Sequence, residues 1–366
     1  IYMYYCTGDN LVNANNIQVY GTQGLYGMYI YGNTGISKGI TTLSNNFISV
    51  FPSGTTSGRG IYVGNSNVVV IANNSINTFF NNINAACIDI PGLDNIYIAN
   101  NILNENGTGY ALYINRPDYV DSSDFNVLKT NGLRLAYLQG ATYANLAAWR
   151  TTGYDAHSIT ADPGFISNTD LHTVESSING LAVPVPGVEY DIDGELRDIT
   201  HPDPGADEFD PPPFEAGLLG IVSPVTDCGL GLENITIAIL NRGTSTISGN
   251  LTAGYVINGI PGSAVAVSGT IASMDTLLFS FPATVDFTAP IGDSSFQLTA
   301  WINLINDPIQ SNDTTSTTVY SKHQPAAPVT TDDIVSFGQT GTLTASPVYP
   351  LFWYTTPISH TPIAQG

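Results

Sequence analysis

Residues 60–76 read GIYVGNSNVVVIANNSI, and residues 87–102 read CIDIPGLDNIYIANNI. Both segments hold a short run of alternating apolar residues, a turn containing Gly or Asn, a second short run, and a pair of asparagines before the next apolar residue. Alternation of this kind points two apolar side chains to one side of a β-strand. Gly and Asn supply the left-handed turns between strands. The two segments are therefore successive copies of one small β unit.

The asparagine pairs recur along the first third of the chain. They begin at residues 15, 45, 73 and 100, which are 30, 28 and 27 residues apart. Strands this short, recurring at such a period, are expected to stack on their counterparts one coil away. Leucine-rich and helical repeats need Leu-rich or 3.6-residue patterns, which do not occur before residue 120. We expect an all-β chain in which residues 1–210 form a right-handed parallel β-helix, with the asparagines bonded in ladders between coils.

The repeat loosens beyond residue 120. Residues 142–151 are predicted to form a short helix that leaves the solenoid, with Leu146 and Trp149 on one face and Gly153 at its end. Short strands are expected to resume between residues 162 and 209 and to close the stack of coils.

The second part of this region contains a series of short motifs: Ala148-Trp149, Gly153-Tyr154-Asp155, Ala161-Asp162-Pro163-Gly164-Phe165, Asp170-Leu171-His172, Asp191-Ile192-Asp193-Gly194-Glu195-Leu196-Arg197 and Gly205-Ala206-Asp207-Glu208-Phe209. This series resembles the C-terminal signature of secreted right-handed β-helix proteins of the Bacteroidetes bacteria. The resemblance implies a fold similar to that of pectate lyases over residues 1–210 and export by the type IX secretion system. Many members of that group lack demonstrated catalysis, and a fold by itself assigns no chemistry.

Pro211-Pro212-Pro213 separates this half from a second kind of β domain. Residues 211–322 contain about seven short apolar runs separated by turn residues, which predicts an Ig-like β-sandwich. They resemble the immunoglobulin-like modules that lie between surface domains of the same bacteria. Residues 323–366 are predicted to be a linker and the first half of a further Ig-like module. Half a sandwich exposes an unpaired edge, so we expect a longer chain, a neighbouring chain or self-association to complete it.

Composition narrows the classes of partner. The chain has 9 Lys and Arg against 30 Asp and Glu, a formal charge of −21, which repels nucleic acid phosphates and anionic membranes. We therefore expect no nucleic acid partner, and the lack of a long apolar run predicts no direct membrane insertion. Acidic, Lys-poor composition is typical of secreted or cell-surface proteins. Cys6, Cys87 and Cys228 are far apart, which predicts buried small apolar residues rather than a disulfide framework.

Three alternating acids are the candidate metal site. A strand would place the carboxylates of Asp191, Asp193 and Glu195 on one face, and clustered carboxylates are the ligands that Ca²⁺ prefers. The alternative is a structural turn at Gly194 with an Asp contact to Arg197. No other cofactor is predicted.

Tyrosines are the candidate partner surface. When the aliphatic residues of the first strand in each coil face inward, their tyrosine neighbours face outward along the stack. Such a row could hold sugar rings or a partner chain, or it could be a stabilising ladder of stacked rings. The candidates are Tyr29, Tyr31, Tyr62, Tyr97 and Tyr113.

Two threonines are candidate O-glycosylation sites. Asp275-Thr276-Leu277 and Asp313-Thr314-Thr315 match the short Asp-Thr motif that the resembling bacterial group modifies. The candidates are therefore Thr276 and Thr314.

The functional hypothesis that follows is a non-catalytic extracellular or cell-surface protein with a structural or adhesive role, as a glycan-binding or fibre-forming subunit. The alternative is a β-helix polysaccharide lyase or hydrolase with accessory Ig-like modules. Among the bases and acids before residue 120 none repeats at coil spacing, and no His precedes His157. The sequence thus offers no recognisable lyase or glycosidase constellation, and no catalytic residue is assigned.

Overall fold

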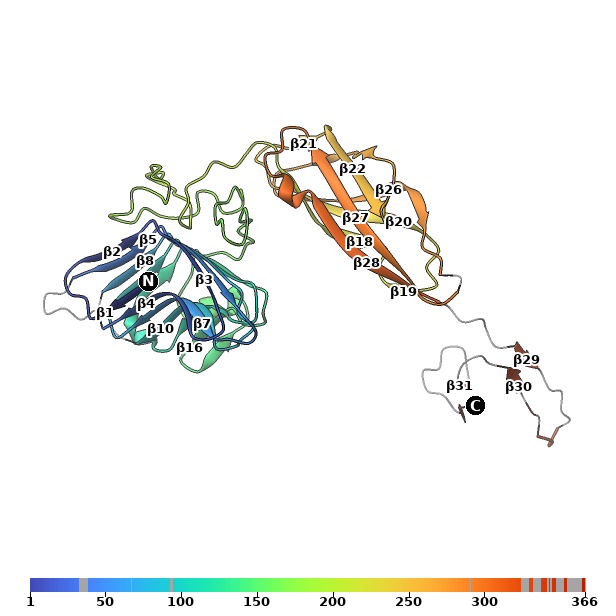
Figure 1. Ribbon diagram of the computed structural model, residues 1–366, viewed down its shortest axis with the longest axis horizontal. Helices are drawn as coiled ribbons and strands as arrows, with labels where there is room; N and C mark the ends of the chain where they lie inside the picture. The colour runs from blue at the N-terminus through green and yellow to red at the C-terminus, as the bar shows by residue number, and fades with distance from the viewer. Residues whose placement is uncertain are drawn as a thin grey trace.

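The computed structural model describes residues 1–32, 39–66, 68–92, 95–289 and 291–323, and short pieces beyond residue 323 (Figure 1). The first part of the chain visits three sheets in turn, and the strands pair in parallel with their counterparts one coil away, except for the last strand of the first sheet, which pairs antiparallel with its neighbour. Sheet A contains β1 (Tyr2–Tyr4), β4 (Leu25–Tyr31), β7 (Gly58–Gly64), β10 (Ala86–Gly92), β13 (Tyr110–Ile114), β16 (Ala136–Leu138) and β17 (Ala141–Tyr143). Sheet B contains β2 (Asn10–Asn13), β5 (Thr41–Ser44), β8 (Val69–Ala72), β11 (Ile96–Ala99) and β14 (Val120–Asp124). Sheet C contains β3 (Asn16–Gly21), β6 (Phe47–Pro52), β9 (Ser75–Thr78), β12 (Ile102–Glu105) and β15 (Val127–Thr130). The predicted parallel β-helix is confirmed.

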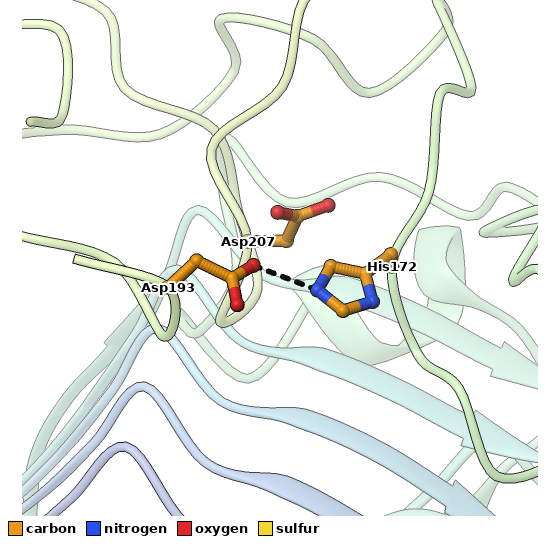
Figure 2. Close-up of side chains that lie close together, drawn as sticks. All are labelled: His172, Asp193 and Asp207. Atoms are coloured by element: carbon orange, nitrogen blue, oxygen red, sulfur yellow. Dashed lines mark hydrogen bonds and ion pairs between the residues drawn. The ribbon is translucent and has the colours of Figure 1, made fainter. Parts of the chain in front are cut away.

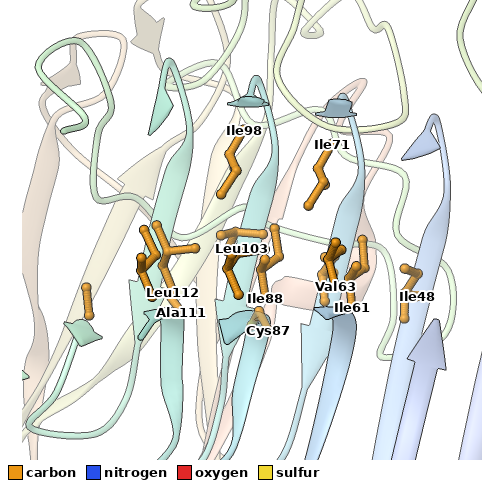
Figure 3. Close-up of a cluster of buried hydrophobic side chains, with 14 of the residues drawn as sticks. Ile48, Ile61, Val63, Ile71, Cys87, Ile88, Ile98, Leu103, Ala111 and Leu112 are labelled. Carbon is orange, nitrogen blue, oxygen red and sulfur yellow. The ribbon is translucent and has the colours of Figure 1, made fainter. Parts of the chain in front are cut away.

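The core of the β-helix is a set of aliphatic rows that run from coil to coil. Ile61 of β7 is in register with Ile88 of β10, which is in register with Leu112 of β13, and all three are fully buried. Figure 3 shows these rows together with side chains from sheets B and C, which meet in the middle of the solenoid. Burying one such side chain contributes about 1.5–3 kcal/mol. The rows therefore hold successive coils in one register.

In the pairs that begin at residues 45, 73 and 100 the two asparagines have different roles, although both lie at the corner between sheets B and C; in the pair Asn15–Asn16, which is shifted by one position, Asn15 aligns with Asn46. The first asparagine of those three pairs takes a left-handed conformation, with φ of 54° at Asn45 and 52° at Asn73. The second points inward and bonds its counterpart on the next coil: Asn46 Nδ2 donates to Asn74 Oδ1 at 2.8 Å, and Asn74 Nδ2 donates to Asn101 Oδ1 at 2.9 Å. The predicted ladder thus runs through Asn15, Asn46, Asn74 and Asn101, and Asn100 Nδ2 also donates to Asn73 Oδ1 at 3.2 Å.

A short helix follows the last coil. Helix α1 (Leu146–Arg150) begins at Asn145, whose side chain accepts a hydrogen bond from Ala148 N at 2.9 Å, as an N-cap does. Trp149 is fully buried and donates its Nε1–H to Asp155 Oδ2 at 2.7 Å. This helix lies within the predicted residues 142–151 and closes that end of the core.

The strands predicted between residues 162 and 209 do not form. The segment 151–210, called the strap below, contains only turns, bends and isolated bridges such as Val127 with Ile159. Prolines and acidic turn residues explain the error, because proline lacks the N–H that a strand ladder needs. The strap instead crosses the first asparagines: Asn45 donates to Tyr190 O at 2.7 Å, and Asn100 donates to Val183 O at 2.6 Å.

Residues 216–322 fold into two mainly antiparallel sheets packed face to face, with Ile237, Phe281, Leu298 and Val319 in the core between them. This confirms the predicted Ig-like sandwich. One sheet contains β18 (Ala216–Ser223), β20 (Leu232–Asn241) and β26 (Thr276–Asp286). The other contains β19 (Asp227–Cys228), β28 (Thr314–Lys322), β27 (Ser294–Leu304), β22 (Leu251–Ile257), β23 (Ile260–Pro261) and β24 (Val265–Ala266). A separate two-stranded sheet is formed by β21 (Ile247–Ser248) and β25 (Thr270–Ile271).

Beyond residue 323 the structure describes two short antiparallel pairs, β29 (Val329–Thr331) with β30 (Thr344–Ser346) and β31 (Phe352–Trp353) with β32 (Ala364–Gln365). The predicted incomplete Ig-like module otherwise lies outside the described residues. No helix in the described part of the chain is long and apolar enough to cross a membrane.

The prediction for the cysteines is right at one position only. Cys87 is fully buried in the β-helix core, whereas Cys6 is partly exposed and Cys228 is exposed. Cys228 ends the two-residue edge strand β19 of the sandwich, where a side chain has little to pack against.

Candidate functional site

Three of the predicted tyrosines form a register-aligned row on the outer face of sheet A. Tyr29 pairs with Tyr62, and Tyr113 pairs with Tyr137, in successive coils. The rings of Tyr29 and Tyr62 are stacked at 4.8 Å and 5°, and those of Tyr113 and Tyr137 at 4.0 Å and 3°. Stacked rings cover one another's faces along the axis of the solenoid, so the row presents ring edges and hydroxyl groups to solvent. Tyr2 extends the row at the first coil, stacked on Tyr29 at 5.3 Å.

An ion pair stands at the one coil where this tyrosine row has no ring. Asp89 occupies the register position between Tyr62 and Tyr113, is 4% exposed, and is paired with Arg59. The Arg59 guanidinium carbon lies 5.9 Å from the centre of the Tyr113 ring, within reach of a cation–π contact. The Arg59–Asp89 ion pair therefore occupies the position between the Tyr62 and Tyr113 rings.

The phenol groups of Tyr62 and Tyr113 are kept protonated. Burial, followed by the charges of neighbouring tyrosines and Asp89, raises the pKa of Tyr62 to about 12. Burial and the hydrogen bond and charge of Tyr137 raise the pKa of Tyr113 to about 12. Each phenol is thus a neutral O–H donor and acceptor across the physiological pH range.

The other two predicted tyrosines stand outside this row. Tyr31 forms a second, shorter column with Tyr4, stacked at 5.3 Å. Tyr97 is on β11 of sheet B, 42% exposed, in register with Val70 and Ser122. Tyr97 therefore faces a different side of the solenoid, because it belongs to the second strand of its coil. Tyr137, which the sequence reasoning missed, could have been found by extending the coil spacing beyond residue 120.

The three acids predicted to bind Ca²⁺ do not converge. Residues 191–195 form a turn rather than a strand, with Gly194 at φ 84°. The buried Asp191 carboxylate accepts hydrogen bonds from Asp193 N at 3.0 Å, Glu195 N at 2.7 Å and Glu208 N at 3.1 Å. Its oxygens are therefore used to hold the turn, while the Glu195 side chain is exposed. Arg197 contacts Glu208 rather than an Asp side chain, at 3.1 Å.

Asp193 belongs to a different grouping, the His172 cluster of His172, Asp193 and Asp207 (Figure 2). Its ligand-type atoms lie within 4.8 Å of one another. Asp193 Oδ2 is 2.8 Å from His172 Nε2, and the other ring nitrogen of His172 is paired with Asp170. Burial alone lowers the pKa of His172, but the hydrogen bonds to the two aspartates outweigh it and the pKa is raised. Burial raises the pKa of Asp207 to about 6.

Thr276 and Thr314 are both exposed, at the first residues of β26 and β28. The backbone N–H of Thr276 donates to Asp275 Oδ1 at 2.8 Å. Accessibility is therefore consistent with modification at either position.

Together these features define the chain as a β-solenoid protein that carries an Ig-like domain. No family profile and no curated protein matches the sequence. Among solved structures, it is similar to the crystal structure of the CARDB domain of the PF1109 protein from Pyrococcus furiosus in complex with di-metal ions, at 14% identity and a TM-score of 0.24, over 30% of this chain and 89% of that one. The solution structure of the same domain gives 14% identity and a TM-score of 0.22, over 31% of this chain and 94% of that one. The metal ions are a property of that protein.

Proposed function

We propose that this chain is a non-catalytic, extracellular glycan-binding protein, in which the tyrosine row of sheet A is the binding surface. The observation that carries the proposal is the register of Tyr29, Tyr62 and Tyr113 on one face of parallel strands. Parallel strands repeat at about 4.8 Å, so the row offers hydroxyl groups at a short, regular spacing. A polysaccharide is a ligand with hydroxyl groups repeated along its length.

The ring edges and the ion pair add to this surface. Ring edges offer apolar contact to the C–H groups of a sugar, while neutral phenols donate and accept hydrogen bonds. Arg59 and Asp89 give a charged point in the row where a polar or acidic substituent is recognised. This is the chemistry of a binding platform, and no step in it requires a nucleophile or a general base.

The test must separate binding from stacking, since the same rings stabilise the outer face of the solenoid. The double variant Tyr62→Phe, Tyr113→Phe keeps both rings and removes both hydroxyl groups. If the row binds glycans through these groups, affinity for immobilised polysaccharides should fall about 5- to 150-fold, at about 0.5–1.5 kcal/mol for each of the two hydrogen bonds. Tyr97→Phe, on sheet B, is the matched control and should bind as the original chain does.

Two outcomes would overturn the proposal. Equal retention of the double variant and the control on every polysaccharide would show that the row is a stabilising ladder only. Release of soluble sugar products, abolished by replacing one acidic or basic residue, would favour the alternative of a polysaccharide lyase or hydrolase.

The cellular setting is part of the same proposal. We infer a secreted or cell-surface location in a bacterium of the Bacteroidetes type, with type IX export and glycans on Thr276 and Thr314. Supporting it are the acidic composition and the exposure of both threonines. Fractionation of the native cells locates the protein, and intact mass before and after replacement of the two threonines by alanine tests the modification.

A further inference from the structure

The His172 cluster is built on a small apolar core that fixes its geometry. Leu171 and Ala206 are fully buried against Phe47 of β6, and Ile192 packs on the same group. Each of these apolar residues immediately precedes one member of the cluster, so three separate strap segments are anchored side by side. The Ile192 N–H also donates to Ala206 O at 2.9 Å. The site is thus preorganised by packing, independently of the polar side chains.

The polar atoms of the cluster are arranged as metal ligands are. Asp170 holds one nitrogen of the imidazole and leaves Nε2 directed into the cluster, which is the carboxylate–histidine–metal arrangement. Asp207 is 7% exposed; its Oδ2 accepts a hydrogen bond from Thr173 N at 3.2 Å, while none of the hydrogen bonds found for the described residues reaches its Oδ1. Asp207 therefore keeps one carboxylate oxygen that none of these hydrogen bonds uses, on a side chain that is largely removed from solvent, and such an oxygen is available to a cation.

Small movements suffice to form a coordination site. Ligand atoms of a tetrahedral Zn²⁺ site are about 3.3 Å apart, given bond lengths of about 2.0–2.2 Å. His172 Nε2 and Asp193 Oδ2, now 2.8 Å apart, must separate slightly, and Asp207 must approach from within 4.8 Å. Asp193 is on the surface, with its side chain 54% exposed, and is free to adjust.

We propose that His172, Asp193 and Asp207 bind one divalent first-row transition metal ion, with Zn²⁺ as the representative, which fastens three segments of the strap together. Three carboxylates, from Asp170, Asp193 and Asp207, surround one imidazole, and a divalent ion balances that charge. The imidazole ligand favours Zn²⁺, Co²⁺ or Ni²⁺ over Ca²⁺, which takes six or more oxygen ligands.

The test is equilibrium dialysis of the full chain against ZnCl₂, with CaCl₂ in a parallel arm, followed by determination of bound metal. We expect one Zn²⁺ per chain and no Ca²⁺ at this site. Asp193→Asn, at an exposed position that leaves the apolar anchors intact, should abolish stoichiometric uptake. Asp170→Asn, which acts through His172, should weaken it about 10–100-fold.

The matched control is His157→Gln. His157 also pairs with an aspartate, Asp124, at 2.7 Å. His157 is not part of the group of potential metal ligands found among the described residues, which is His172, Asp193 and Asp207. This variant should bind Zn²⁺ as the original chain does. Substitution by Co²⁺ gives a second readout, because its visible absorption reports tetrahedral coordination and should be lost in His172→Gln.

Three results would overturn the proposal. One is the absence of Zn²⁺ and Co²⁺ uptake by the folded chain; another is uptake that persists in both Asp193→Asn and His172→Gln. A third is binding of Ca²⁺ in preference to Zn²⁺, which would assign the site to oxygen ligands of the strap.

Discussion

At the scale of single residues, the β-helix depends on a few buried polar side chains. Asn74 is the clearest case, because it is fully buried and makes all of its bonds within the corner between sheets B and C. Its Nδ2 donates to Leu43 O, Ala72 O and Asn101 Oδ1, and its Oδ1 accepts from Asn46. The backbone N–H of Asn46 also donates to Asn74 Oδ1 at 3.2 Å, so five neighbouring groups are satisfied by one amide.

Asn74→Ala should therefore destabilise the β-helix by about 3–5 kcal/mol, since each buried group left without a partner costs about 1–3 kcal/mol. The control is Asn73→Gly, at the preceding position, where φ is 52° and glycine takes that conformation without strain. It loses the bond to Asp203 O and the bond from Asn100 Nδ2, both at 3.2 Å, and should cost about 2 kcal/mol. Urea unfolding measures both values, and equal costs at the two positions would contradict the division of roles.

Glu105 is a second buried polar residue, and it makes the β-helix sensitive to pH. It is fully buried and accepts hydrogen bonds from Thr78 Oγ1 at 2.6 Å, Phe80 N at 3.0 Å and Gly107 N at 2.7 Å. Burial outweighs these bonds and raises the pKa of Glu105 to about 7, from 4.5. The folded state therefore holds this proton more tightly than the unfolded state does.

Stability from this group is fully present below pH 4.5 and is lost as the pH rises to about 7. Glu105→Gln cannot titrate, so the free energy of unfolding of the original chain should fall relative to the variant across that window. The slope of the difference should approach about 1.4 kcal/mol per pH unit. Unfolding curves recorded at several pH values give the slope, and parallel pH profiles for the two chains would show that Glu105 does not titrate there.

At the scale of elements, the strap has almost no secondary structure of its own and is held by side chains. Arg197 is the centre of these contacts. Its guanidinium donates to Asn45 Oδ1 at 2.9 Å, Gly205 O at 3.0 Å and Asp203 O at 3.2 Å, and it pairs with Glu208 at 3.1 Å. One arginine therefore joins the β-helix to two turns of the strap.

Arg197→Ala should release the strap and leave the coils folded, because the core rows of the solenoid do not involve it. Removing one partner of a buried ion pair costs about 3–5 kcal/mol. Hydrogen exchange should accelerate in residues 183–208 and remain slow in β7, β10 and β13. Arg134→Ala, in the connection between β15 and β16, serves as the control. Uniform acceleration across both regions would mean that the strap and coils unfold together.

At the scale of the whole molecule, the strap is also the connection between the β-helix and the sandwich (Figure 1). Arg242, which follows β20 of the sandwich, pairs with the strap residue Glu175, which is 4% exposed. The Ser176 hydroxyl donates to Arg242 O. The two domains therefore share a buried ion pair at their junction.

Glu175→Gln should loosen this junction, since it leaves the Arg242 charge without its partner in a partly buried site. We expect small-angle X-ray scattering to show a broader distribution of molecular lengths, and calorimetry to show the two domains melting further apart. Ser311→Ala, at an exposed position of the same junction, is the control. Identical scattering from Glu175→Gln and the original chain would show that the junction is held by other contacts.

The spacing of the asparagine pairs and the alternation of apolar residues determined the β-helix, the helix near residue 148 and the sandwich, because these patterns are local and periodic. The sites were decided by tertiary structure. Tyr97 lies outside the tyrosine row because it is on the second strand of its coil, in sheet B. The carboxylates of Asp191 and Asp193 do not converge because these residues lie in a turn rather than a strand. His172, Asp193 and Asp207 meet only because Leu171, Ile192 and Ala206 pack together on Phe47. Contacts between residues so far apart in the chain follow no sequence period, so only the folded strap brings them together.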